Sequence, residues 1–295
     1  QIDLYDFATL KKVSTLIDTK NFTELADGID SYTFSKDEKQ VLIATNSNQI
    51  FRHSFTADYF LYNLSTKVLT KVLTKVLEQV QEPTFSPDGT KIAFAKENNL
   101  FIYEVNSKKT IQVTSDGKKN AIINGITDWV YEEEFAFVRA FDWSADSKKL
   151  AFIRFDESQV PEFSMNIFQK DLYPSVETFK YPKAGEKNAE VSLHIYNVSS
   201  NASKQINLGN YSDFYIARMK WTNDANVLSA QVLNRHQDNL DLIFVDGNSG
   251  VAKVVLNEKD KAYVDVTDNL TFLQDNSFIW TSEKDGFNHI YLYDK

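Results

Sequence analysis

A short unit recurs along this chain and restricts the folds that the chain can adopt. Each copy begins with an aromatic residue and Ser or Thr, continues through a polar turn-forming cluster and ends in an apolar strand. Three clear copies are Thr33–Ala44, Thr84–Ala95 and Asp142–Ile153, and looser copies begin at Lys220 and Thr271. Self-similarity of this kind indicates an architecture built by repeating one small structural unit.

The turn in the second copy shows why each unit predicts a hairpin. Pro87 presets φ, Asp88 can hydrogen-bond its own backbone and Gly89 accepts a positive φ. The flanking residues alternate and are β-branched or aromatic, as in paired strands. Three units are followed by a further strand pattern, at Asn99–Glu104, Leu240–Asp246 and His289–Asp294.

The spacing of the units predicts an all-β fold, a β-propeller with four-stranded blades. The aromatic residues that mark the copies recur at intervals of roughly 50 to 80 residues, against a period of about 40–50 for a propeller blade. A β-sandwich also consists of hairpins and is the alternative. The repeated order of strand, turn, strand and strand favours the propeller.

Two intervals between copies are long enough to hold insertions. The interval between Phe85 and Trp143 contains the acidic stretch Asp128–Phe135. The interval between Trp143 and Trp221 contains Tyr181–Asn188, a Pro- and Gly-containing loop that we expect to leave the blade as an arm. Loops carried on a rigid scaffold commonly hold functional residues.

The acidic stretch places Glu132, Glu133 and Glu134 between Trp129, Tyr131 and Phe135. Adjacent like charges repel each other, and aromatic neighbours that bury the segment would leave the carboxylates in need of a cation. An amine of a ligand could supply that cation. A solvated acidic turn is the alternative, because most charge runs are exposed faces.

Composition excludes several classes of function. The 295 residues include 42% hydrophobic ones, enough for a core, and the net charge of -9 argues against nucleic acid as a partner. The chain has no Cys, which excludes disulfides, Cys-based zinc sites and thiol catalysis. No metal-ligand spacing stands out, so we expect neither a metal nor another cofactor.

The segment Lys67–Leu77 departs from the repeat scheme because it is a tandem repeat of period four. On a helix its apolar residues would form a stripe, whereas on a strand Val and Leu would face opposite sides. Its β-branched content slightly favours an extended strand and loop.

Three stretches together resemble the N-terminal propeller of dipeptidyl peptidase IV in the prolyl oligopeptidase family, with the bacterial members the most similar. The stretches are Asn124–Phe135, Arg52–Ser54 and Tyr181–Gly185. The first is long and specific, and the other two add weight because they occur in the same order. The resemblance implies that residues 1–295 are part of an eight-bladed propeller with a short helical insertion carrying the Glu-Glu motif.

The resemblance also implies a function. The family releases N-terminal dipeptides that carry Pro or Ala at the second position, and Glu133 and Glu134 match the pair that holds the α-ammonium of the substrate. Arg52 matches the Arg that contacts a backbone carbonyl of the substrate. We expect Asp128, Trp129 and Tyr131 to support the inserted helix, although simple core packing is an alternative for both aromatic residues.

The nucleophile of such an enzyme is not in this chain. None of the nine glycines frames a Gly-x-Ser-x-Gly elbow, and Gly247–Gly250 has the wrong spacing. The resemblance therefore implies a separate C-terminal α/β-hydrolase domain that carries the Ser, Asp and His, so we expect this chain alone to be inactive. It also implies homodimerisation, with the segment Tyr181–Asn188 involved, and an extracytoplasmic location, periplasmic or cell-surface, in a bacterium.

Two further hypotheses remain open at this level. The chain could be a non-catalytic propeller that binds proteins, in which case the Glu pair would be a vestige. It could also be a propeller glycosidase that uses Glu133 or Glu134 as an acid together with a second carboxylate about 5–9 Å away. No sugar-stacking pattern supports the glycosidase.

Overall fold

The computed structural model describes residues 1–66, 68–71 and 79–294. The chain divides into two compact units. The first comprises residues 1–96 and 102–110, and the second comprises residues 97–101 and 111–295. No helix in the described ranges is long and apolar enough to cross a membrane.

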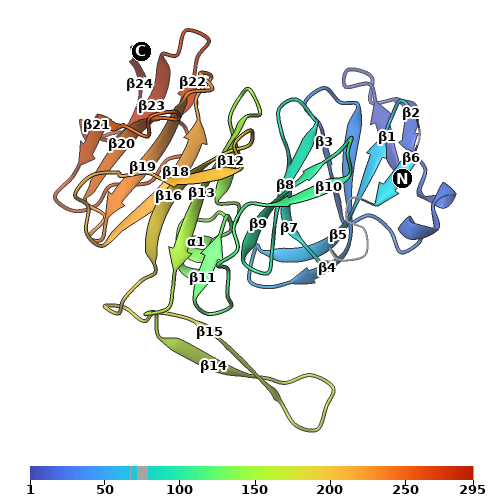
Figure 1. Ribbon diagram of the computed structural model, residues 1–295, viewed down its shortest axis with the longest axis horizontal. Helices are drawn as coiled ribbons and strands as arrows, with labels where there is room; N and C mark the ends of the chain where they lie inside the picture. Colours follow the sequence, from blue (N-terminus) through green and yellow to red (C-terminus); the bar gives the residue numbers. More distant parts are fainter. Residues whose placement is uncertain (67, 72–78, 295) are drawn as a thin grey trace. The chain divides into compact units, whose positions relative to one another are not determined.

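The first unit opens with a hairpin and continues with a four-stranded sheet (Figure 1). The hairpin strands β1 and β2 are followed by two single 3-10 turns, η1 and η2. Their bounds are Ile2–Tyr5, Lys12–Ile17, Thr19–Asn21 and Thr23–Leu25. The sheet consists of β3 (Ser31–Phe34), β4 (Gln40–Gln49), β5 (Phe55–Asn63) and β6 (Val68–Lys71), paired in chain order.

The next four strands form a second sheet, paired in chain order, and the division of the chain falls at β9 and β10. Its strands are β7 (Gln81–Phe85), β8 (Lys91–Lys96), β9 (Asn99–Glu104) and β10 (Lys109–Gln112).

The second unit contains the remaining sheets and the helix. Its first sheet joins β13 to β11, β12 and β16, and β16 to β17. A four-stranded sheet β18–β21 and a three-stranded sheet β22–β24 follow, again in chain order. The bounds are β11 (Ile122–Asn124), α1 (Trp129–Glu134), β12 (Phe141–Trp143), β13 (Lys149–Asp156), β16 (Glu190–Asn197), β17 (Ala202–Gln205), β18 (Phe214–Trp221), β19 (Val227–Asn234), β20 (Asn239–Asp246), β21 (Ala252–Lys259), β22 (Thr271–Phe272), β23 (Phe278–Ser282) and β24 (His289–Tyr293).

Sheets built from consecutive strands are propeller blades and not the halves of a sandwich, whose strands cross between sheets. The second strands β8 and β19 are buried on both faces, because layers pack against both sides of them. The predicted all-β propeller fold with a short helical insertion is therefore confirmed. The predicted third strands are β9, β20 and β24.

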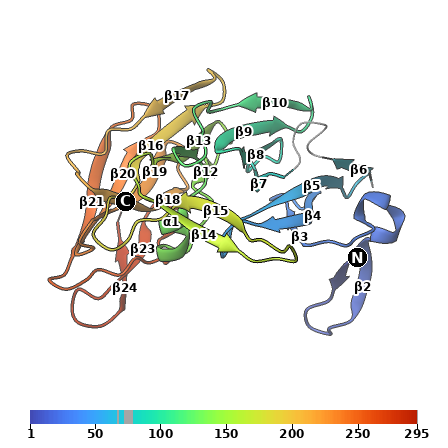
Figure 2. The same cartoon turned by 90° about the horizontal axis from the view of Figure 1, so that it is seen from below.

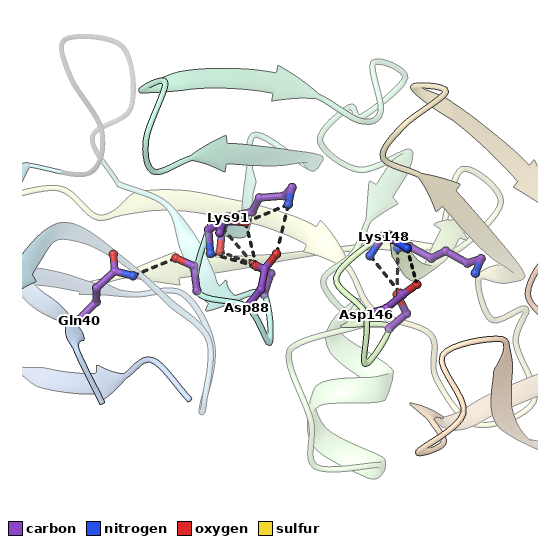
Figure 3. A network of polar contacts seen from close by, with 10 residues as sticks. Gln40, Asp88, Lys91, Asp146 and Lys148 are labelled. Carbon is purple, nitrogen blue, oxygen red and sulfur yellow. Dashed lines mark hydrogen bonds and ion pairs between the residues drawn. The ribbon is translucent and has the colours of Figure 1, made fainter. Parts of the chain in front are cut away.

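The repeated turns share one hydrogen-bonding scheme (Figure 3). The hydroxyls of Ser35, Ser86 and Ser144 each donate to the carboxylate two residues later, at 2.6 to 2.7 Å. The same oxygens accept from the backbone N–H five residues on, at 2.9 to 3.0 Å. A side chain of each turn thus accepts a hydrogen bond from a backbone N–H of the same turn. This local pairing explains why the residue pattern is visible in the sequence.

Side chains also tie each turn to the neighbouring blade. The Gln40 amide donates to the Gly89 carbonyl at 2.9 Å within the first unit, as Figure 3 shows. In the second unit the Asp142 carboxylate accepts from the backbone N–H of Trp221 at 2.9 Å, and the Trp221 ring nitrogen donates to the Asp142 carbonyl at 3.0 Å. These contacts fix the spacing of adjacent blades.

The projecting arm of the second unit is not the segment that the sequence suggested. It is the hairpin of β14 (Glu162–Ile167) and β15 (Ser175–Lys180), whereas Tyr181–Asn188 is the loop that returns from it to β16 (Figure 1). Pro182 and Gly185 mark this return, and the hairpin itself has no Asn-Gly or Asp-Gly turn to identify it. The predicted position of the arm was therefore wrong by one segment.

The period-four repeat falls only partly within the described residues. Val68–Lys71 form β6, in agreement with the preference for an extended conformation. Residue 67 and residues 72–78 lie outside the described residues.

Candidate functional site

The acidic motif lies on α1, at the end of a short ladder that extends from the third blade. The backbone N–H of Thr127 donates to the Val138 carbonyl at 3.0 Å, and that of Ala140 donates to the Gly125 carbonyl at 3.0 Å. Gly125 has a φ of +75°, and a Cβ there would lie 2.8 Å from a methyl carbon of Leu100. Glycine is favoured at this position, because another residue would be strained at this φ and its Cβ would crowd Leu100.

Asp128 caps the helix. Its carboxylate accepts from the backbone N–H of Tyr131 at 3.0 Å, and its own backbone is extended, as an N-cap requires. The side chain is buried, and this burial raises the pKa of Asp128 to about 6, against the lowering effect of its backbone hydrogen bonds. The predicted role of Asp128 as a support agrees with this geometry.

Tyr131 anchors the helix to the fourth blade. Only 1% of the residue is exposed, and its phenol oxygen accepts from the backbone N–H of Ile216 at 3.0 Å. Its ring packs against four other aromatic rings with centroids 4.8 to 6.0 Å apart, those of Phe135, Phe137, Phe155 and Tyr215. Tyr131 is therefore both a core residue and a hydrogen-bonded support.

Trp129 faces a different neighbour. It is half-buried, and its ring lies 4.3 Å from that of Tyr181 at an interplanar angle of 48°. Tyr181 directly follows β15, so the helix contacts the base of the projecting hairpin (Figure 2).

The three glutamates of α1 differ in exposure. Glu132 is buried with 1% exposed, Glu133 is half-buried and Glu134 is exposed. The carboxylates of Glu133 and Glu134 therefore reach solvent from a helix whose opposite face is fixed in the core.

Arg52 lies in the first unit, in the loop between β4 and β5, and is exposed. The Gln49 side-chain amide donates to the carbonyls of Phe51 and Arg52 at 2.5 and 3.0 Å, which shapes this loop. Glu133 and Glu134 belong to the second unit. The predicted cooperation of Arg52 with the Glu pair stays a prediction.

Tyr263 is a neighbour of the motif that sequence reasoning missed. The pKa of its phenol is raised by burial, by Asp265 and by the charge of Glu134, so the hydroxyl lies within electrostatic reach of the motif. Tyr263 also lines a cavity of about 500 Å³ together with buried Glu258 and with Trp280. No signal could have found Tyr263, because it follows α1 by two blades in an irregular loop.

Glu157 is a second buried acid behind the helix. Burial is the main cause that raises its pKa to about 7, and the nearby charge of Asp128 adds to the effect. Lys180, at the end of β15, lowers the pKa of Glu157 in opposition. The Lys180 ammonium itself donates to the Val160 carbonyl at 2.8 Å at the base of the hairpin.

His194, in the second unit, has structural surroundings. His194 stacks on Phe152 with centroids 5.1 Å apart, and its ring hydrogen-bonds the Ser192 hydroxyl at 2.9 Å. Burial is the main cause that lowers the pKa of His194 to about 4, so the ring is neutral near pH 7. This agrees with the absence of a Gly-x-Ser-x-Gly elbow from the sequence.

Comparisons with known proteins agree with the fold. Residues 35–295 match the family described as dipeptidyl peptidase IV N-terminal region. The crystal structure of Porphyromonas gingivalis dipeptidyl peptidase 4 is similar with a TM-score of 0.93 and 41% identity, over 99% of this chain and 42% of that one. A putative dipeptidyl aminopeptidase IV from Bacteroides ovatus shares the fold at a TM-score of 0.71 and 23% identity, over 97% of this chain and 39% of that one.

Sequence relatives lead to the same family. Dipeptidyl aminopeptidase B of Saccharomyces cerevisiae is 31% identical over 95% of this chain and 36% of its own length. A probable dipeptidyl-aminopeptidase B of Talaromyces marneffei is 32% identical over 86% of this chain and 31% of its own length. The chain thus spans about a third of the length of these relatives. It belongs to the family of the dipeptidyl peptidase IV N-terminal region.

Proposed function

We propose that this chain is the substrate-recognition propeller of a serine dipeptidyl peptidase. In this proposal Glu133 and Glu134 bind the α-ammonium of a peptide whose N-terminal dipeptide ends in Pro or Ala. The Ser, Asp and His that cleave the peptide belong to a separate α/β-hydrolase domain of the same protein. The family membership and the names of the relatives support the peptidase activity.

The observation that carries the proposal is the way α1 presents its carboxylates. Asp128 and Tyr131 fix the helix in the core, while Glu133 and Glu134 reach solvent. Both glutamates occupy the C-terminal end of the helix, where the helix dipole disfavours negative charge by a few tenths of a kcal/mol. A cationic ligand bound at these carboxylates would oppose this unfavourable effect.

The chemistry of the ligand follows from the carboxylates. An α-amino group has a pKa of about 7.7–8.0 and is mostly protonated at neutral pH. An ammonium group can donate charge-assisted hydrogen bonds to two carboxylates, which an acylated N-terminus cannot do. Anchoring the amine also fixes which peptide bond reaches the nucleophile, because the distance from the N-terminus is then set.

Arg52 complements the pair in this proposal by binding the first backbone carbonyl of the peptide. A guanidinium suits that role because it presents several N–H donors in a fixed planar arrangement. Arg52 is exposed in the loop between β4 and β5.

Assembly and location are parts of the same proposal. We place the homodimer contact at the hairpin of β14 and β15, whose end exposes Phe168, Leu172 and Tyr173 by 79 to 90%. The intact protein is proposed to work outside the cytoplasm of a bacterium. Sedimentation and cell fractionation would test these two statements.

The experiment for the proposed function uses the full-length gene product. Gly-Pro-p-nitroanilide and its N-acetylated form are compared as substrates. Cleavage of the free amine alone supports an ammonium clamp. Cleavage of both substrates would indicate that the amine is not recognised, and cleavage of neither would favour the non-catalytic, protein-binding propeller.

A further inference from the structure

The six residues of α1 cannot hold the Glu pair in place by themselves. A helix this short leaves most of its backbone groups without intrahelical partners, and isolated helices of this length are not stable in water. The described backbone bonds at its ends are Glu132 N–H to Asp128 O at 3.2 Å and Phe135 N–H to Tyr131 O at 3.1 Å. Tertiary contacts must therefore orient the glutamates.

One face of α1 is buried in the core, and the face beside it makes different contacts. Residues three and four apart share one face of a helix. Asp128, Tyr131, Glu132 and Phe135 follow that spacing and are all buried. Trp129 and Glu133 are four residues apart. Their side chains therefore leave the helix next to each other, on the face that adjoins the buried one.

Trp129 is fixed in turn by Tyr181. Their ring centroids are 4.3 Å apart, the shortest described separation between two aromatic rings in the second unit. Offset and tilted aromatic contacts of this kind add to the stabilisation from burial alone. A half-buried Trp at the edge of the core therefore depends on Tyr181 for its orientation.

Tyr181 makes a backbone hydrogen bond and ring contacts at the base of the hairpin. Its backbone N–H donates to the Pro161 carbonyl at 3.0 Å, which closes the hairpin at the base. Its ring contacts those of Phe163 and Phe179, at 5.5 and 6.1 Å, and these two residues are a cross-strand pair of β14 and β15. The Tyr181 ring thus packs against two rings, one from each strand of the hairpin.

We propose that Tyr181 is a positioning residue for the Glu pair and acts through Trp129. The hairpin of β14 and β15 then serves as the second support of the motif helix, alongside the Tyr131 contact to β18. This inference rests on the proposed function, because it gives Tyr181 a role only if Glu133 and Glu134 bind the substrate amine. The loss of this support lets the Glu133 side chain move away from the position that suits the ammonium.

The test uses the full-length enzyme with Gly-Pro-p-nitroanilide. Tyr181→Ala is expected to raise KM about tenfold while kcat changes less, because a misplaced clamp weakens binding of the amine before it affects the chemistry. Tyr181→Phe keeps the ring and is expected to stay within about twofold of the wild type. Tyr5→Ala, an equal truncation at an exposed residue of β1, is the matched control.

Glu133→Gln separates this inference from the proposed function. A rise in KM for Glu133→Gln together with a normal KM for Tyr181→Ala would overturn the positioning role and leave the clamp intact. An unchanged KM for Glu133→Gln would instead overturn the proposed function. If both single variants raise KM, the double variant should raise it by less than the product of the two effects, since both act on the same carboxylate.

A variant that unfolds would not decide the question, so a second one is included. Tyr181→Leu keeps apolar volume at the site but has no ring, and the same rise in KM is expected for it. A melting temperature near that of the wild type, with KM raised for Leu and not for Phe, supports the proposal. Equal KM values for Leu, Phe and the wild type would contradict it.

Discussion

The backbone N–H of Ile216 donates a hydrogen bond of 3.0 Å to the phenol oxygen of Tyr131. Ile216 lies in β18, the edge strand of its blade, and Tyr131 lies in the motif helix. A backbone N–H of this edge strand thus finds its acceptor in a side chain that is inserted from another blade. This hydrogen bond attaches the helix to the fourth blade, in addition to the packing of the Tyr131 ring against Tyr215.

Tyr131→Phe should therefore destabilise the protein more than the loss of one exposed hydroxyl would. The change leaves a buried N–H without its acceptor, at a cost of about 1–3 kcal/mol in the free energy of unfolding. The melting temperature of the purified protein measures this loss. Tyr103→Phe is the control because Tyr103 is buried to a similar degree and its hydroxyl binds no other described residue. Equal melting temperatures for the two variants would contradict the assignment.

The raised pKa of Asp128 makes the stability of the folded protein depend on pH. Burial raises its pKa from 3.8 to about 6, so the folded state binds a proton that the unfolded state has already lost. The contribution of Asp128 to stability is thus fully present below pH 3.8 and is lost as the pH rises through 6. The difference amounts to roughly 3 kcal/mol.

Asp128→Asn tests this dependence because Asn caps helices as well as Asp and carries no charge. Relative to the wild type, the variant should gain stability progressively as the pH rises from about 4 to about 6, as measured by thermal unfolding at each pH. Other acids titrate in both proteins, so only the difference between them is informative. A constant difference across this range would show that Asp128 does not titrate there.

The repeated turns offer a matched pair of backbone substitutions. Gly89 has a φ of +68°, and a Cβ there would lie 3.2 Å from the Gln40 side chain, so Gly89→Ala should cost about 1 kcal/mol or more. Glu38 occupies the corresponding place in the first copy with a φ of 57°, and it is exposed. Glu38→Gly should therefore be neutral or stabilise by up to about 1 kcal/mol. A loss of stability in Glu38→Gly, or no loss in Gly89→Ala, would contradict the equivalence of the two turns.

Glu134, the exposed glutamate of the pair, should matter for activity and not for stability. Glu134→Gln in the full-length enzyme is expected to lower kcat/KM for Gly-Pro-p-nitroanilide by roughly 30- to 150-fold, the loss of about 2–3 kcal/mol of charge-assisted bonding. Its melting temperature should stay near the wild-type value. Glu177→Gln, an exposed glutamate of β15, serves as the charge-matched control. A near-normal rate for Glu134→Gln would argue against its role.

Local chemistry explains which features could be predicted from the sequence. In the turns at Ser35, Ser86 and Ser144 the donors and acceptors lie within six residues of one another. The local residue pattern is therefore enough to predict the turn. The cap at Asp128 is local in the same way. The blade fold followed from such local segments, whereas the motif helix was expected from the family resemblance.

Contacts between distant segments could not be predicted in this way. The hairpin of β14 and β15 is stabilised by pairs such as Phe163 with Phe179 and lacks a short turn signature, so the Pro- and Gly-containing return loop was mistaken for it. The neighbourhood of Glu134 and Tyr263 depends on how successive blades pack. Residue types alone do not encode that packing.

The central claim is that Glu133 and Glu134 recognise the substrate by its free amine. The most direct test is the ratio of kcat/KM for Gly-Pro-p-nitroanilide to that for its N-acetylated form, measured for the full-length enzyme and for the Glu133→Gln/Glu134→Gln variant. The account predicts a large ratio in the wild type that falls to near one in the variant, because the rate with the free amine drops while the rate with the blocked substrate changes little. A ratio that stays large in the variant would show that other residues recognise the amine.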